Sequence, residues 1–200
     1  MKSYAVIAPP AQEPLAVTDA AAFLRLAPGA EDLATLQALL SVAREFVENH
    51  TGRALLPTGY RLLSTDWTGG QITWSGDSIT LDRSPLLSVQ SVKYIAAGET
   101  TLTTLAPADY AVITGTTPGG ILLHVDPPAL AERPDAVQIE FTAGHATAAE
   151  IPAVLLHALR LLVSNFYEQR APINVGNITS ELPLGLRHLL DSQRVGGWVG

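Results

Sequence analysis

The segment Ile151–Arg170 constrains the fold of this chain more than any other part of the sequence. Placed on a helix, IPAVLLHALRLLVSNFYEQR is apolar around most of its circumference and leaves only a narrow polar line. That line consists of His157, Arg160, Ser164 and Glu168. A helix of this kind needs apolar neighbours on two sides. We expect one side to face the chain's own core and the other to face a second protein, which favours assembly over solution chemistry.

Composition narrows the class of protein further. A chain of 200 residues that is 47% apolar can form one domain with a core, or one domain with an insertion. The net charge of −7 argues against binding that neutralises nucleic-acid phosphates, and it leaves open a surface that DNA slides past without sticking. The absence of cysteine excludes disulfides, thiolate metal sites and cysteine nucleophiles.

The sequence shows no membrane segment. The beginning, MKSYAVIAPPAQEP, lacks the long apolar run of a signal peptide. The most apolar stretch, Ile151–Tyr167, is interrupted by His157, Arg160 and Asn165, so a buried helix is the better interpretation. We expect a soluble protein of the cytoplasmic type.

Periodicity and turn residues divide the chain into helical and β-rich parts. The predicted helices are Thr18–Leu26, one from Glu31 to a stop at Gly52, Ile151–Arg170 and Pro183–Arg194. Between them, short runs rich in Thr, Val and Ile predict antiparallel strands. These runs are Tyr60–Thr65, Ile72–Trp74, Ser78–Leu81, Val89–Ile95, Tyr110–Ile113, Ile121–His124 and Val137–Thr142, with turns at Gly69-Gly70 and Gly119-Gly120.

The predicted fold class is therefore α+β. It is a small helical bundle, of three longer helices and a short C-terminal one, with a β-rich antiparallel insertion between the second and third helices. We expect an extended arm at 1–14, a bundle core at 15–54 and 150–170, the β-rich insertion at 55–149, and a flexible tail with a short helix at 171–200.

Motifs that carry chemistry are missing from the sequence. It contains no P-loop, G-x-G-x-x-G, G-x-S-x-G or H-E-x-x-H pattern, and its five histidines lack the spacing of metal ligands. We predict no enzyme, no cofactor, and no catalytic, cofactor-binding or metal-binding residue. One alternative is a small hydrolase in the β region, and it requires His124, Asp126 and His145 to converge.

The last quarter of the chain is nearly neutral and rich in leucine, which is typical of a protein-contact segment. The predicted partner contacts in the tail are Leu184, Leu186, Leu189, Leu190 and the aromatic Trp198. Arg160 and Arg170 are predicted to pair with acidic residues of a neighbouring subunit.

Four pieces in this order resemble the head–tail connector (adaptor) proteins of tailed bacteriophages and of related prophage and gene transfer agent particles. They are LAVTDAAAFLRL (Leu15–Leu26), AREFVENHTGRAL (Ala43–Leu55), LDRSPLLSVQSVKYI (Leu81–Ile95) with the later Asp135–Arg170, and ELPLGLRHLLDSQRV (Glu181–Val195).

The resemblance implies a structural role in the virion, at the head–tail junction. Proteins of this family form a ring, typically a dodecamer, beneath the portal protein. The ring extends the DNA channel and docks the stopper or tail-terminator protein, so the implied partners are those proteins, other copies of this chain, and DNA that passes without specific binding. A tail-completion, stopper or other oligomeric virion protein is the alternative.

Overall fold

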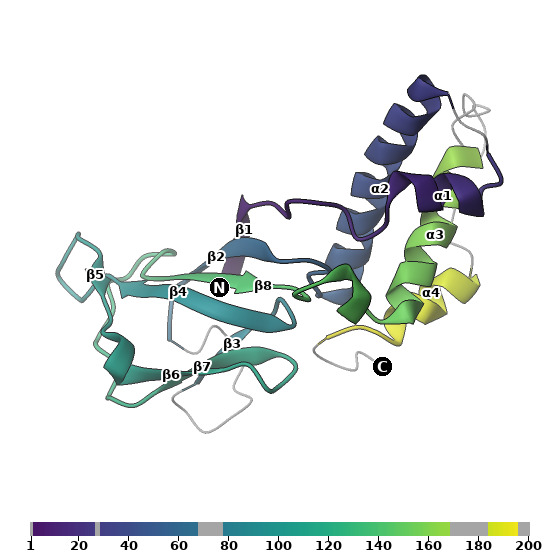
Figure 1. The fold of residues 1–200 in the computed structure, drawn as a ribbon. Coiled ribbons are helices and arrows are strands. Elements are labelled where there is room, and N and C mark those ends of the chain that lie inside the picture. The colour runs from purple at the N-terminus through teal and green to yellow at the C-terminus, as the bar shows by residue number, and fades with distance from the viewer. Residues whose placement is uncertain (1, 27–28, 68–77, 169–183, 196–200) are drawn as a thin grey trace.

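Helices and strands occupy opposite sides of the molecule (Figure 1). The computed structural model describes residues 2–26, 29–67, 78–168 and 184–195. Its helices are α1 (Val17–Phe23), α2 (Ala30–Thr51), α3 (Ala153–Glu168) and α4 (Leu184–Asp191). Its strands are β1 (Lys2–Ala8), β2 (Thr58–Ser64), β3 (Ser78–Leu81), β4 (Leu86–Tyr94), β5 (Thr103–Thr104), β6 (Tyr110–Ile113), β7 (Gly119–Leu123) and β8 (Val137–Ala143). The predicted α+β fold class is confirmed.

The helical layer is built around α2, which α1, α3 and α4 cover. One stripe of α2 is fully buried at helical spacing and consists of Leu36, Leu40, Ala43 and Val47. The helix ends at Gly52, whose φ of 70° is the left-handed conformation that favours glycine, as the sequence predicted. In the described ranges, no helix combines the length and apolar character that a membrane crossing requires.

The C-terminal helix belongs to this layer. Leu186 and Leu190 of α4 are 3% and 0% exposed and lie in the same core as α2 and α3. His50 at the end of α2 contacts Asp191, with Nε2 and Oδ1 2.8 Å apart. The backbone N–H of Val195 donates to the carbonyl of Thr51 at 2.8 Å. Residues 184–195 are therefore part of the helical core, where we had expected a separate flexible tail.

The strands form two stacked antiparallel sheets (Figure 1). The larger has the order β1-β2-β8-β4-β5 and the smaller the order β3-β7-β6. Along β2 and β8 every second residue is buried, which is the pattern of a sheet with one face on a core and one open to water. The buried face contributes Leu62, Ile139 and Phe141 to a second hydrophobic core, which it shares with Ile79 and Ile121 of the smaller sheet.

The beginning of the chain is a strand of the larger sheet. Lys2–Ala8 pairs along β2, where we had expected an extended arm. The inward side chains fix its position: the Lys2 ammonium donates to the Thr80 carbonyl at 2.7 Å, and the Tyr4 hydroxyl donates to Asp82 Oδ2 at 3.1 Å. The alternation of Lys2, Tyr4 and Val6 was the sequence signal for this strand.

Two glycines that predicted a turn lie inside a strand. Gly119 and Gly120 begin β7, and the structure leaves no space for a side chain at either position. A Cβ at Gly120 would lie 2.6 Å from the Ile79 carbonyl oxygen, and one at Gly119 would lie 2.6 Å from the Leu86 Cβ. Glycine here permits close packing between strands and not a turn. The predicted strand Ile72–Trp74 lies outside the described residues.

A buried polar network joins the helical layer to the sheets. Arg44 of α2 lies between two carboxylates, with Nε 2.9 Å from Glu13 Oε2 and Nη1 2.9 Å from Glu48 Oε2. The other oxygen of Glu48 accepts the Leu55 backbone N–H at 2.8 Å. Arg83, which follows β3, donates to the backbone carbonyl of Glu48 at 3.1 Å. The network therefore fixes α2 against the chain segment that enters β2.

Candidate assembly surfaces

Helix α3 packs its apolar side on the chain's own core, and its opposite side is polar. Its inner side is fully buried and consists of Leu155, Ala158, Leu159, Leu162 and Val163. Further apolar residues, Leu156, Leu161 and Phe166, pack against the core but stay partly open to solvent. The side away from the core carries His157, Arg160, Ser164 and Glu168, so α3 lacks the second apolar face that we had expected to contact another protein.

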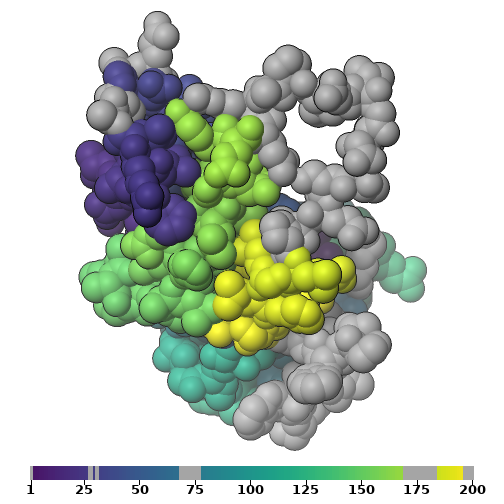
Figure 2. All heavy atoms as spheres, turned by 90° about the vertical axis from the view of Figure 1, so that its right-hand side faces the viewer, coloured from purple at the N-terminus to yellow at the C-terminus, as the bar shows by residue number. Residues whose placement is uncertain are grey.

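A groove runs between α3 and α4, and Figure 2 shows α4 lying against α3 on one face of the molecule. The groove has a volume of about 410 Å³. Its lining residues are Leu161, Ser164, Asn165 and Glu168 of α3 together with Gly185, Leu186 and Leu189 of α4. Leu184 begins α4 and is 75% exposed. This side of the molecule therefore combines a hollow with an exposed leucine.

The structure separates the predicted contact residues into two groups. Leu184 and Leu189 are accessible at the surface of α4, while Leu186 and Leu190 hold α4 on the chain's own core. Arg160 is half-buried and forms no ion pair with the residues that the structure describes. Arg170 and Trp198 lie outside the described residues.

A second hollow, of about 280 Å³, lies between the end of β1, α2 and β2. Arg83 sits over the Tyr60 ring, 5.6 Å from its centre, and donates to Asn49 Oδ1 at 3.2 Å. Burial, with the nearby Glu48 carboxylate, raises the pKa of Tyr60 to about 12. This hydroxyl stays protonated at neutral pH and is a poor general base. The charged groups here bind one another, so the hollow has a structural role.

The pKa values in the network agree with this role. Burial raises the pKa of Glu48, although the Leu55 N–H and the Arg44 charge counteract it. Burial also lowers the pKa of Arg44, but Glu48 and Glu13 outweigh that effect and the net shift is upward. The guanidinium is thus held in its charged form between two acids.

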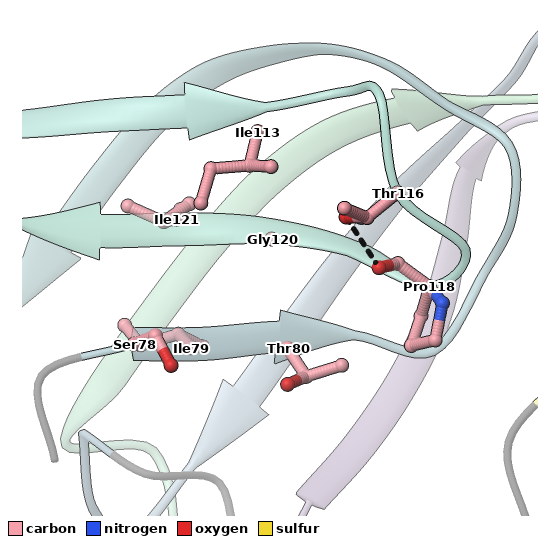
Figure 3. Close-up of a pocket in the computed structure, with 9 residues that line it drawn as sticks. Ser78, Ile79, Thr80, Ile113, Thr116, Pro118, Gly120 and Ile121 are labelled. Carbon is pink, nitrogen blue, oxygen red and sulfur yellow. Dashed lines mark hydrogen bonds between the residues drawn. The ribbon is translucent and has the colours of Figure 1, made fainter. Parts of the chain in front are cut away.

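A third hollow lies on the smaller sheet (Figure 3). Ile79, Ile113 and Ile121 contribute apolar walls, and the Thr116 hydroxyl donates to the Pro118 carbonyl at 2.9 Å near its rim. Its volume of about 40 Å³ is far below the several hundred Å³ of an ordinary ligand site. The hollow is therefore a packing feature.

The three residues of the hydrolase alternative do not converge. His124 and Asp126 follow the end of β7, whereas the start of β7 packs on Leu86, beside Ala143 at the end of β8. His145 follows that end of β8, so about one strand length separates it from His124. In the part of the chain that the structure describes, no three His, Asp or Glu side chains gather into a metal-binding group.

The chain matches no family profile and no curated protein. It does match solved structures over its whole length. A chain in the neck of an empty gene transfer agent (GTA) particle, computed with C6 symmetry, is 25% identical with a TM-score of 0.72, over 100% of this chain and 98% of that one. A chain in the virion of a native GTA particle is 26% identical with a TM-score of 0.72, over 98% and 97%.

The resemblance to head–tail connector proteins is confirmed. A chain in the neck of a native GTA particle with C12 symmetry, 24% identical, shares the fold with a TM-score of 0.67 over 100% of this chain and 98% of that one. The connector-like fold includes β1 and α4, the two elements whose packing the sequence did not predict.

Proposed function

We propose that this chain is a structural neck protein of a phage-like particle and acts there as a head–tail connector. It forms a ring of identical copies beneath the portal protein, extends the DNA channel, and docks the stopper or tail-terminator protein. The whole-length likeness to chains of GTA particles, at a TM-score of 0.72, is the observation that carries this proposal.

Features of the chain support an assembled ring. A ring needs a head-to-tail contact, in which two different surfaces of one subunit meet. The groove beside α4, with Leu161 and Leu189 in its walls, and the exposed Leu184 offer apolar surface for such contacts. The net charge of −7 suits a channel wall that repels the DNA backbone and lets it pass.

Leu184 and Leu189 are the residues we propose for the portal contact. Leu184 is exposed at the start of α4, and Leu189 is partly exposed and lines the groove. Trp198 is proposed as an additional anchor, and Arg160 and Arg170 as contacts between subunits. Leu186 and Leu190 serve the fold, because they are buried in the chain's own core.

The proposed role involves no catalysis and no cofactor. A connector works through its contacts, in the virion, after its synthesis in the bacterial cytoplasm.

Capture by portal-bearing heads tests the proposal. The purified chain is mixed with DNA-filled heads that lack necks and tails, and the vertex is imaged by electron microscopy. We expect a ring of this chain on the portal. Leu184→Asp should weaken capture at least tenfold, whereas Val112→Asp, on the smaller sheet, should not. If both variants are captured equally well, the portal contact does not lie on α4. Capture by tails and not by heads would contradict the connector role.

A further inference from the structure

The larger sheet has two edges with unpaired backbone groups. β1 pairs with β2 on one side, and no backbone hydrogen bond from the described residues reaches its other side. At the opposite edge, β5 pairs only with Lys93 and Tyr94 of β4. Within the described ranges this leaves the outer side of β4 unpaired from Leu86 to Ser91. Such edges are templates for a further strand.

Neither edge carries the charges that usually protect an exposed strand. No charged residue occurs from Ser3 to Gln12 or from Leu86 to Val92. Lys2, at the start of β1, directs its ammonium inward to the Thr80 carbonyl. Val6 and Ile7 are 57% and 44% exposed. In a chain of net charge −7, two neutral edges are places where copies can approach without repulsion.

Both edge strands also contain register shifts, which favour a partner strand of matching twist. The pairing of β1 with β2 shifts register between Val6 and Ala8. The pairing of β4 with β8 shifts twice, at Leu87 and at Gln90. Bulges increase the local twist of a strand, so these edges fit a strand of matching twist better than a flat one.

The strand order makes the two edges compatible with each other. β1, β2, β8 and β4 are successively antiparallel, so β4 runs opposite to β1. A second copy in the same orientation therefore brings its β1 antiparallel to β4 of the first. One row crosses all four strands at Ala5, Arg61, Glu140 and Ser91. If this row continues straight from one copy into the next, which we call the level register, Ala5 of one copy lies beside Ser91 of the next.

We propose that neighbouring copies of this chain join edge to edge, with β1 of one copy pairing with β4 of the next, so that one sheet continues from subunit to subunit. This inference rests on the ring of the proposed function. Pairing between two β1 strands would instead close a two-fold dimer and could not continue. The β1–β4 contact joins unlike surfaces, and the same contact can repeat until a ring closes.

Disulfide trapping tests the contact, because the natural sequence contains no cysteine. Ser91→Cys is combined in turn with Ala5→Cys, Ser3→Cys or Ile7→Cys, which covers the level register and a slip of two residues either way. All four positions lie on the outward face of the sheet, away from the core. Within one copy, positions 5 and 91 are three strand spacings, about 14 Å, apart. That exceeds the reach of a disulfide, so any crosslink joins two copies.

The full-length variants are assembled on portal-bearing heads, oxidised, and run on a denaturing gel without reductant. At least one pair should give a ladder of covalent oligomers. Each single variant should give dimers at most, and so should the control pair Ala5→Cys with Gln138→Cys, because β8 lies between β2 and β4. A ring seen by microscopy without a ladder from any pair overturns the edge contact and leaves the connector role intact. Absence of both ring and ladder overturns both.

Discussion

Single residues at the junction of the two layers hold the fold together. Arg44 and Glu48 have side chains only 11% and 7% exposed, and each binds more than one partner. Replacing both partners of such a pair can be neutral, but removing one leaves an uncompensated buried charge. The sequence gives no sign that Arg44 and Glu48 are buried, because an i, i+4 pair of charges on a helix is usually exposed. It could not show that residues 53–55 and 83 cover that side of α2.

Removing the Glu48 carboxylate should therefore be costly. We expect Glu48→Ala to lower the free energy of unfolding by about 2–4 kcal/mol, because the buried Leu55 N–H loses its acceptor and Arg44 keeps only Glu13 of its two carboxylates. Glu45→Ala is the matched control, since Glu45 is exposed and lies 3.8 Å from the same arginine. Its effect should stay within about 0.5 kcal/mol. Urea unfolding followed by circular dichroism measures both, and equal effects would contradict the structural role of the network.

His145 should make the stability of the protein depend on pH. Burial, with the Arg53 charge, lowers the pKa of His145, and within the described residues its Nε2 has no hydrogen-bond partner. The folded state thus prefers the neutral ring. The resulting stabilisation is present above the ordinary pKa of about 6.5 and is lost as the pH falls through the lower folded value.

Unfolding at pH 7.5 and pH 5.5 measures this effect. The urea concentration at the unfolding midpoint of the natural chain should be lower at pH 5.5 than at pH 7.5. The decrease should be smaller for His145→Gln, because glutamine does not titrate. An identical fall in both proteins would assign the pH dependence to other groups.

Among the elements, periodicity predicted the helices and strands whose pattern is complete within one stretch of sequence. The buried stripe of α3 and the bounds of β3 and β6 follow from local pattern. β1 was missed because its partner β2 begins about fifty residues later. In α4, Leu186 and Leu190 are four residues apart and share a face, whereas Leu184 lies on another. The sequence shows these two faces, but only the packing shows which one the core takes.

The two faces of α4 should respond differently to truncation. Leu190→Ala should lower the free energy of unfolding by about 2–5 kcal/mol, because Leu190 is fully buried and leaves a cavity. Leu184→Ala should change it by less than about 0.5 kcal/mol. Thermal unfolding of the two variants compares them directly. A stable Leu190→Ala protein would mean that α4 is dispensable for the fold.

For the whole molecule, the proposed role depends on the surfaces through which it contacts other proteins. The missing catalytic motifs and the order of the four sequence pieces pointed to a connector. The likeness to GTA neck and virion chains agrees with that family over the entire length. The candidate contact surfaces were less predictable. The groove and the two sheet edges are formed by segments distant in sequence, so only the folded chain shows them.

A reconstruction of the assembled particle at side-chain resolution is the decisive test of the claim that this chain forms a ring in the neck. We expect a closed ring of this chain between portal and tail, with DNA passing through its centre and Leu184 of each copy facing the portal. Density for this chain elsewhere in the particle, or its absence from complete particles, would contradict the claim.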